Sequence, residues 1–160
     1  MQHLLTFDEC RSLGRKIGKV DDDRLSAYIT EVELQQVQRT FGSELFKKMQ
    51  QADKDARVAV LLDGGEYDGV VFAGLKTAIA YFVYALLIMD GDYQSTRYGV
   101  VVKQSDYSNR LSSTERSNAY NNTLAVANQY LSDCVKYCRA VGLMHNGKST
   151  MTSYTIRKIG

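Results

Sequence analysis

The longest apolar run in the chain extends from Ala73 to Met89, and its second part, Ala78–Met89, contains only apolar residues. A helix that is apolar on every side lies in the middle of a protein or in a membrane. These 12 continuous apolar residues are fewer than the roughly 20 that cross a bilayer. The run therefore predicts a central core helix, and no contact with a membrane is expected.

A second apolar pattern, with alternating spacings of four and three residues, predicts a long helix closer to the C-terminus. It consists of Tyr120, Leu124, Ala127, Leu131, Cys134, Cys138 and Val141. This spacing places all of them on one helix face, as a continuous seam. Ser112 and Glu115 fit a capping box at the start, and Gly142 suits the position after the last turn. We therefore expect a helix from Ser112 to about Val141, packed on the core through this seam.

Capping signals predict two helices in the N-terminal part of the chain. Thr6 and Glu9 resemble a capping box, which predicts a short helix at about Phe7–Lys16. The acidic run Asp21–Asp23 supplies an N-cap and favourable charge for a stronger helix at Arg24–Thr40. The first apolar face of that helix consists of Leu25, Tyr28, Ile29 and Val32.

Glycine positions divide the middle of the chain. Gly42 suits the end of one helix and Ser43 the N-cap of the next, which should run to Met49 at an angle to the first. The apolar run Val58–Leu62 fits either a helix or a strand, and Asp63–Gly65 predicts a turn after it.

Residues 90–111 are polar and rich in turn-forming residues around the strand-like Gly99–Val102. They predict a long, hairpin-like loop, a kind of connection often used for contacts.

The last segment, Leu143–Gly160, carries Lys148, Arg157 and Lys158 but no acidic residue. Within it, Thr152–Ile156 has strand-forming composition, with Tyr154 and Ile156 on one face. This stretch would pair with Gly99–Lys103, pair with the edge of another subunit, or remain a solvated terminus.

Length and composition favour one mainly α-helical domain. The chain has 160 residues, 44% of them hydrophobic and 24% charged, as in globular proteins. Proline is absent, which permits long uninterrupted helices. We expect a compact helical bundle over residues 1–142, followed by an extended basic tail over residues 143–160.

The charge and the first residues exclude some classes of protein. A net charge of +2 gives no global field that would capture nucleic acid. The opening MQHLLTFDEC lacks the pattern of a secretory signal peptide. Three cysteines in a chain of this length predict reduced thiols in a cytoplasm-like compartment.

The stretch Gly142–Ser149 satisfies the phosphate-loop pattern of two glycines followed by lysine and serine. Such a loop needs a strand before it and a helix after it, whose N-terminus helps to hold the phosphates. Here a long helix is expected before Gly142, and strand-forming residues follow Ser149. We therefore interpret the match as a coincidence and expect no nucleotide hydrolysis.

Neither a metal site nor a catalytic site is predicted. Cys134 and Cys138 lie one helical turn apart and could be combined with His145 and Cys10 as zinc ligands, but both belong to the buried seam. Histidine occurs only as His3, in a start that we expect to fray, and as His145. The acidic pairs Asp21–Asp22 and Asp90–Asp92 are explained by caps and turns. We expect no enzyme activity and no cofactor.

Tyrosine is abundant, with 11 residues in the chain. Those expected in loops or in the tail are Tyr67, Tyr93, Tyr98, Tyr107 and Tyr154. Exposed tyrosines favour protein interfaces, although some pack at the rim of a core, and both interpretations stay open.

Three segments resemble the head–tail connector (adaptor) family of tailed bacteriophages. Ala27–Met49, AYITEVELQQVQRTFGSELFKKM, resembles the helix–glycine–helix opening of these proteins. Leu61–Ala85, LLDGGEYDGVVFAGLKTAIAYFVYA, resembles their next block. Ser95–Ser108, STRYGVVVKQSDYS, followed by a long helix, is similar to versions from phages and prophages of Bacteroidetes.

The resemblance implies a structural virion protein, made in the host cytoplasm and located at the head–tail interface. It would be one subunit of a ring, commonly of about twelve copies. The ring binds the portal protein and neighbouring tail or connector rings, and phage DNA passes through it without being read. The resemblance implies contacts with the portal or a neighbour for Lys148, Tyr154, Ile156, Arg157 and Lys158. It implies a lumen or inter-ring position for Tyr93, Arg97, Tyr98, Lys103, Tyr107 and Arg110.

Two other classes of function stay open at this point. One is a nucleotide-binding enzyme that uses Gly142–Ser149. The other is a small helical ligand-binding or regulatory module, which would need an enclosed apolar pocket.

Overall fold

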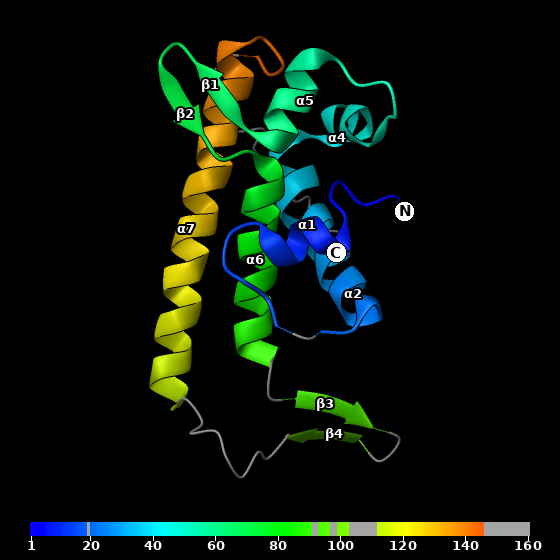
Figure 1. The fold of residues 1–160 in the computed structure, drawn as a ribbon, viewed down its shortest axis with the longest axis vertical. Helices are drawn as coiled ribbons and strands as arrows, with labels where there is room; N and C mark the ends of the chain where they lie inside the picture. The colour runs from blue at the N-terminus through cyan, green and yellow to red at the C-terminus, as the bar shows by residue number, and fades with distance from the viewer. Residues whose placement is uncertain (19, 91–92, 97–98, 103–111, 146–160) are drawn as a thin grey trace, which may run out of the picture.

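The fold is organised around α6 (Leu75–Asp90), which has α7 (Ser113–Ala140) antiparallel along one side and α2 (Asp22–Val32) along the other (Figure 1). The computed structural model describes residues 1–18, 20–90, 93–96, 99–102 and 112–145. Ile79 and Val83 of α6 are fully buried, so the expected central core helix is confirmed. No described helix is long and apolar enough to cross a membrane.

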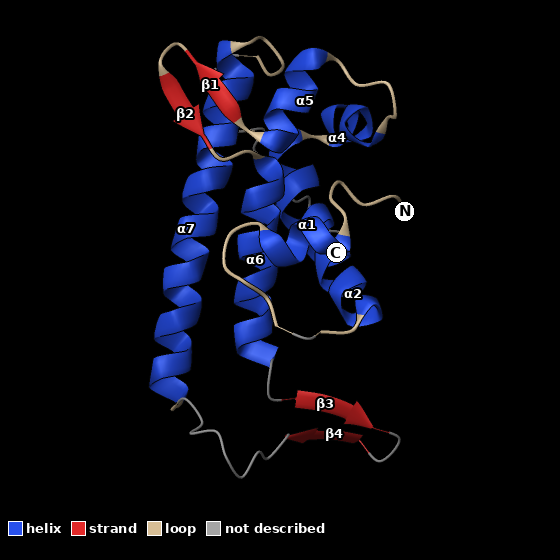
Figure 2. Ribbon diagram, in the orientation of Figure 1, coloured by secondary structure: helices blue, strands red, loops and turns tan. Residues whose placement is uncertain are grey.

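Helices make up most of the described residues, and the strands form two short antiparallel hairpins (Figure 2). The mainly α fold class predicted from the sequence is therefore confirmed. The long helix near the C-terminus and the hairpin between residues 90 and 111 are confirmed with it.

The long helix α7 begins and ends where its capping residues predict. The backbone N–H of Glu115 donates to Ser112 Oγ at 3.2 Å, and the N–H of Ser112 donates to Glu115 Oε2 at 2.8 Å. At the other end the N–H of Leu143 donates to the carbonyl of Cys138 at 2.9 Å, which closes the last turn. The buried face consists of Thr123, Ala127, Leu131, Cys134, Tyr137 and Cys138. The seam thus packs on the core, as expected.

The helix expected at Arg24–Thr40 is a continuous helical segment that contains an unpredicted π-helical part. It comprises α2, the π-helix η1 (Glu33–Gln38) and α3 (Arg39–Phe41). Asp21 is its N-cap, because its Oδ1 accepts the N–H of Arg24 at 2.8 Å. Wider π turns shift the side chains that follow them around the helix. In this helix the π turns begin at the buried Glu33.

The break after α3 is confirmed, but its predicted N-cap is wrong. Gly42 occupies the junction between α3 and α4 (Ser43–Gln50), and Ser43 is the first residue of α4. The Ser43 hydroxyl accepts a hydrogen bond from the Gln38 amide at 3.1 Å instead of capping the helix.

The apolar run Val58–Leu62, whose pattern fits a helix or a strand, is helical. It lies within α5 (Ala56–Asp63).

The first residues of α5 are tied to the end of α7. Asp55 is the N-cap of α5, and the Arg57 side chain donates to Asp55 Oδ2 at 2.7 Å and to the Val141 carbonyl at 3.0 Å. The Tyr137 hydroxyl donates to the Arg57 carbonyl at 3.0 Å. Hydrogen bonds from the Arg57 side chain lower the pKa of Asp55 to about 2.

We expect Asp55→Asn to weaken the protein at neutral pH and to have no effect near pH 2. Asparagine keeps the N-cap but loses the charge that Arg57 contacts. The pKa of Asp55 in the folded state lies below its ordinary 3.8, so the unfolded state binds more protons between these values. The contribution of Asp55 is therefore complete above its ordinary pKa and is lost as the pH falls toward about 2. Urea unfolding of the wild-type protein and the Asp55→Asn variant from about pH 2 to neutral pH tests this prediction. A difference in unfolding free energy that does not change with pH would contradict it.

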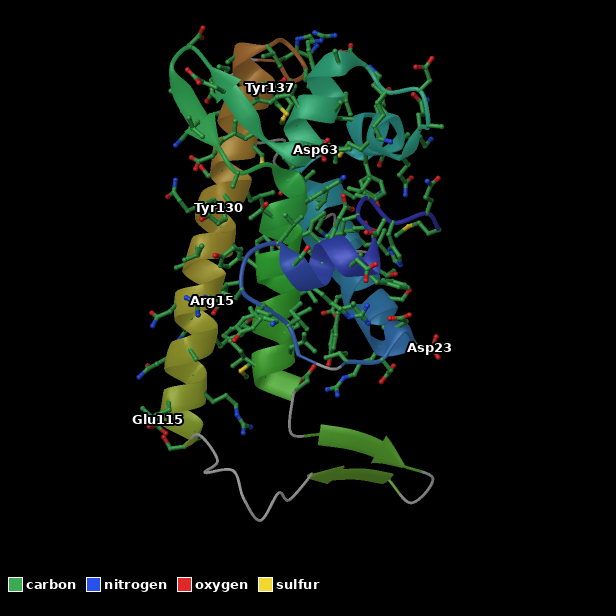
Figure 3. The ribbon with its side chains drawn as sticks, in the orientation of Figure 1. Arg15, Asp23, Asp63, Glu115, Tyr130 and Tyr137 are labelled. Carbon is green, nitrogen blue, oxygen red and sulfur yellow. The ribbon has the colours of Figure 1, made fainter. Side chains whose placement is uncertain are left out.

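Between α5 and α6 the chain forms a hairpin that the sequence analysis did not predict. Strand β1 (Gly65–Tyr67) pairs with β2 (Val70–Phe72), with Glu66 opposite Val71. Rings of the hairpin pack on α7: Phe72 stacks on Tyr137 with centroids 4.7 Å apart, and Tyr67 meets Tyr137 edge-on. Figure 3 shows Tyr137 beside this hairpin. The expected turn at Asp63–Gly65 is the start of it.

The second hairpin follows α6 and lies beyond the ends of the long helices (Figure 1). Strand β3 (Tyr93–Thr96) pairs with β4 (Gly99–Val102), with Tyr93 opposite Val102. The strand-like character of Gly99–Val102 is thereby confirmed. Pairing of Thr152–Ile156 with this strand involves residues outside the described part of the chain.

The first helix, α1 (Phe7–Ser12), crosses α6 and is shorter than the Phe7–Lys16 expected. The Thr6–Glu9 capping box is present at its start. The helix ends early because the chain turns at Gly14 against the ring of Tyr81 on α6. Lys76 on α6 holds α1 and α5 together, with Nζ 2.8 Å from Glu9 Oε1 and 2.8 Å from Asp63 Oδ1.

Candidate functional site

His3 connects the N-terminal segment to two polar side chains of the α2–η1 helix. Its Nδ1 lies 3.1 Å from Glu33 Oε2, and its Nε2 lies 2.9 Å from Ser26 Oγ. With Glu33 ionised, Nδ1–H donates to the carboxylate and Nε2 accepts the Ser26 hydroxyl. The expectation that His3 lies in a frayed start is therefore wrong.

Glu33 is a charged residue with no exposed surface, and it holds the N-terminal segment in place. Its Oε1 accepts the backbone N–H of Leu4 at 2.6 Å, while Oε2 faces His3. Burial raises the pKa of Glu33, and the hydrogen bonds from Leu4 and His3 offset part of this effect. A buried carboxylate is tolerated only with such donors, because an unpaired buried charge is very costly.

The order Ser26–His3–Glu33 matches the order of nucleophile, base and orienting acid in hydrolytic enzymes. Ser26, however, lies in the second turn of α2. Backbone N–H groups there are engaged in helical hydrogen bonds, so they are not free to stabilise an oxyanion. The geometry therefore supports a structural role, in which His3 and Leu4 anchor the first residues on the helix.

We expect Glu33→Ala to destabilise the protein by about 1–3 kcal/mol, since the buried Leu4 N–H would lose its acceptor. Glu33→Gln is the matched control. A glutamine accepts the Leu4 N–H and donates to His3 Nδ1, so that His3 Nε2–H then donates to Ser26. Urea unfolding and hydrogen exchange at the Leu4 amide measure the difference. Equal losses in both variants would show that the charge, and not the hydrogen bonds, holds the anchor.

The three cysteines lie in the core as free thiols. Cys10, Cys134 and Cys138 each have 0% exposure. Burial raises the pKa of each to about 12, which keeps them protonated and unreactive at neutral pH. His145 is exposed. Among the described residues, no group of three or more His, Cys, Asp or Glu side chains is placed to hold a metal ion.

The first glycine of the phosphate-loop pattern ends a helix. Gly142 follows the last residues of α7, at the hydrogen-bonded cap described above. A phosphate loop instead follows a strand. Residues 146–149, which include the lysine and serine of the pattern, lie outside the described part of the chain.

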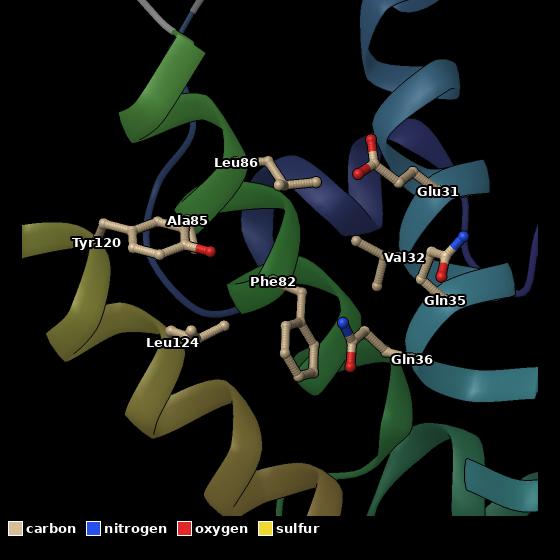
Figure 4. Close-up of a pocket in the computed structure, with 9 residues that line it drawn as sticks. All are labelled: Glu31, Val32, Gln35, Gln36, Phe82, Ala85, Leu86, Tyr120 and Leu124. Carbon is tan, nitrogen blue, oxygen red and sulfur yellow. The ribbon is translucent and has the colours of Figure 1, made fainter. Parts of the chain in front are cut away.

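A small groove lies between α7 and the α2–η1 helix, with α6 as its floor (Figure 4). The floor consists of Phe82, Ala85 and Leu86 of α6. One wall consists of Tyr120 and Leu124, and the other of Glu31, Val32, Gln35 and Gln36. Its volume is about 60 Å³, whereas pockets for drug-sized ligands measure about 300–1,000 Å³. The groove therefore gives little support to a ligand-binding module.

Most residues for which the resemblance implies contacts lie in parts of the chain that the structure does not describe. Lys148, Tyr154, Ile156, Arg157 and Lys158 lie outside the described residues, as do Arg97, Tyr98, Lys103, Tyr107 and Arg110. Tyr93 is the first residue of β3, where the structure describes the backbone. These assignments stay predictions.

Comparison with known proteins identifies the chain by its family. Residues 37–144 match the model of DUF6712, described as a family of unknown function. The chain belongs to the DUF6712 family. No curated protein and no solved structure matches it.

The DUF6712 match extends from η1 to the end of α7, and so contains α4, α5, both hairpins and α6. His3, Ser26 and Glu33 precede it. The anchor of the N-terminal segment is thus outside the part of this chain that the DUF6712 model covers, while the α6–α7 pair is inside it.

Proposed function

We propose that this chain is a structural virion protein, a subunit of the connector ring between the portal and the tail of a tailed phage. The ring would form part of the DNA channel, and its subunits would contact the portal and the neighbouring tail or connector rings. The proposal assigns no catalytic step and no cofactor to the protein.

The proposal is carried by the order of elements across the segments that resemble connector proteins. Ala27–Met49 contains most of α2, η1, α3 and α4, with Gly42 at the junction between helices. Leu61–Ala85 contains the end of α5, the first hairpin and most of α6. Ser95–Ser108 includes β4 and precedes the long helix α7. This order of helix, glycine, helix, core helix and long terminal helix supports the proposal.

The hairpin β3–β4 also supports a role in assembly. It lies beyond the ends of α6 and α7 (Figure 1), and among the described strands each strand of this hairpin pairs along one edge only. Exposed strand edges readily accept a further strand from another protein. A hairpin at this position is suited to contact a portal or a second ring.

The proposal is tested by mixing the purified chain with the portal protein encoded in the same genome. Electron microscopy should show an additional ring on the portal, and the two proteins should migrate together in gel filtration. A portal that remains bare at high concentrations of the chain would overturn the proposal.

A charge-matched pair of variants tests the predicted role of the tail. Replacing Lys148, Arg157 and Lys158 by glutamine should weaken portal binding by about tenfold or more, since about 1.4 kcal/mol corresponds to a factor of ten. The control replaces the exposed Lys47, Lys48 and Arg139 by glutamine, which changes the net charge equally. Equal weakening in both variants would assign the effect to overall charge and remove the tail from the contact.

Titration of the protein with ATP or GTP in the presence of magnesium distinguishes the nucleotide-binding alternative from the connector proposal. Tight binding that Lys148→Ala abolishes would favour that alternative over the connector proposal.

A further inference from the structure

Strand β2 of the first hairpin (β1–β2) carries two of the five large apolar side chains that are exposed among the described residues. Val71 is 76% exposed and Val70 49%, whereas Phe72 is buried against Tyr137 of α7. A strand that exposes adjacent valines favours association with a further strand unless another element covers it. The described residues thus leave an apolar patch on β2.

The backbone of β2 also offers a hydrogen-bonding edge. The residues that flank the two-residue turn exchange hydrogen bonds within the hairpin. In the next pair, Glu66 and Val71, the N–H and C=O groups therefore point away from the partner strand. Among the described strands β2 pairs with β1 alone. A β-carbon at Gly65 of β1 would lie 3.3 Å from Val60 of α5, so β1 is on the side of α5 and β2 has the outer edge (Figure 1).

The first hairpin is acidic and the C-terminal tail is basic. Residues 58–75 contain three acidic side chains and no Lys or Arg, and Glu66 and Asp68 of the hairpin are exposed. Residues 143–160 contain three basic side chains and no Asp or Glu. Opposite charges of this kind favour the encounter of two surfaces and suppress wrong partners. The tail is therefore complementary in charge to the hairpin.

The tail leaves the described fold beside the first hairpin. Tyr137, near the end of α7, contacts two aromatic rings of the hairpin. The described chain then continues to His145 at the same end of the molecule (Figure 1). The next residues, 146–151, span at most about 20 Å when extended, and they precede the strand-forming Thr152–Ile156. This segment is close enough to reach the edge of β2.

The second hairpin is out of reach of the tail of the same chain. The β3–β4 hairpin lies at the end of the molecule where α7 begins, and the tail follows the opposite end of α7 (Figure 1). This helix has 28 residues, which separate its ends by about 42 Å at 1.5 Å per residue. Residues 146–151 cannot span that distance, so the sheet edge available to the tail within one chain is that of β2.

We infer that Thr152–Ile156 adds to the outer edge of β2 as a third strand in the isolated chain. Tyr154 and Ile156, which share one strand face, flank Val71, and the basic residues that follow lie near Glu66. The segment is attached to the same fold, which gives it a high effective concentration at this edge and favours it over a separate partner. The contact does not depend on the connector function, and binding of the tail to a portal would first require release of this strand.

Hydrogen exchange at the Val71 amide tests the added strand on the full chain. This N–H points to the outer edge, so its exchange is slow only when a further strand accepts it. Proline cannot take part in strand pairing, and Thr155→Pro should therefore raise the exchange rate at Val71 by about tenfold or more. The amide of Ile79 in α6 should keep its rate, which shows that the fold is intact. An equal rate at Val71 in both proteins would overturn the inference.

Disulfide formation in double variants tests which face of the tail flanks β2. Val71→Cys is combined with Tyr154→Cys, Ile156→Cys or Ser153→Cys, and dilute protein is treated with oxidised glutathione. The first two pairs should form an intramolecular disulfide about ten times faster than the third, because successive strand side chains point to opposite faces. Equal rates in all three would indicate a tail without a fixed position and overturn the inference. Disulfides between two chains, in place of intramolecular ones, would assign the edge to another copy and also overturn it.

A matched pair of charge variants tests the complementarity. In the Val71→Cys/Tyr154→Cys protein, Glu66→Lys should slow the intramolecular disulfide about threefold or more, since like charges then oppose the approach of the basic tail. Glu44→Lys changes the net charge equally at an exposed position on α4 and should leave the rate unchanged. Equal slowing by the two substitutions would contradict a contact between the tail and the acidic hairpin.

Discussion

Gly74→Ala is expected to destabilise the protein by about 2–6 kcal/mol, because two costs combine at one position. Gly74 has a φ of +87°, a conformation that costs other residues about 1–3 kcal/mol. A β-carbon there would lie against the backbone nitrogen of Gly64 and 2.6 Å from the carbonyl carbon of Asp63. Both neighbours are backbone atoms, so no change of side-chain rotamer relieves the clash, and overpacking adds about 1–3 kcal/mol.

Gly69→Ala is the matched control for this prediction. Gly69 also has a positive φ, +75°, but no atom lies within 4 Å of the position of its β-carbon. Only the backbone cost of about 1–2 kcal/mol applies there. Urea unfolding of the two variants separates backbone strain from close packing. Equal losses of unfolding free energy in the two variants would show that the backbone segments at Gly64 and Gly74 can move apart without an energetic cost.

The second large effect is expected in the centre of α6. Ile79 has 0% exposure, and truncation of a buried isoleucine to alanine typically costs about 2–5 kcal/mol. Ile79→Val removes one methylene group and should cost about 0.5–1.5 kcal/mol. The graded series distinguishes loss of packing from a general defect of the variant protein. Thermal unfolding, checked by urea titration, provides the measurement.

Val71→Ala is the exposed counterpart of the Ile79 series. Its side chain is 76% exposed on β2, and surface substitutions of this kind usually change stability by less than about 0.5 kcal/mol. If Ile79→Ala were as mild as Val71→Ala, α6 would not be the centre of the core.

Short-range patterns in the sequence predict most of the helices of this protein. Thr6 with Glu9 and Ser112 with Glu115 form the capping boxes that their spacing predicts. The apolar periodicity of α7 and the apolar run of α6 identify buried faces because packing against other helices is what these patterns reflect. Such signals need no knowledge of distant residues.

The first hairpin was missed although it has a local signal. Tyr67 and Val70 flank Asp68-Gly69, a dipeptide that favours a two-residue turn with positive φ at both positions. In the structure these angles are 47° and 75°. The strands have three residues each, which are too few to establish an alternating pattern. The turn residues Asp68 and Gly69 are therefore the local signal that predicts the hairpin.

The His3 anchor depends on contacts that no short-range pattern reveals. Glu33 and His3 are 30 positions apart, and a glutamate within an amphipathic helix normally points to solvent. Glu33 lies between Val32 and Val37, which are both buried. The periodicity of a regular α-helix, however, does not predict the π turns that begin at Glu33. Burial of a charge is decided by the partner that reaches it, here the first residues of the chain.

The central position of α6 has a consequence for synthesis of the chain on the ribosome. The helix α2, which covers one side of α6, precedes α6 in the chain. The helix α7, which covers the other side, is the last described helix to be synthesised. A nascent chain therefore exposes an apolar surface until α7 has been made, and such surfaces cause aggregation. Fragments that stop before Ser113 should accumulate in inclusion bodies, whereas chains that include α7 can bury this surface as soon as they are released.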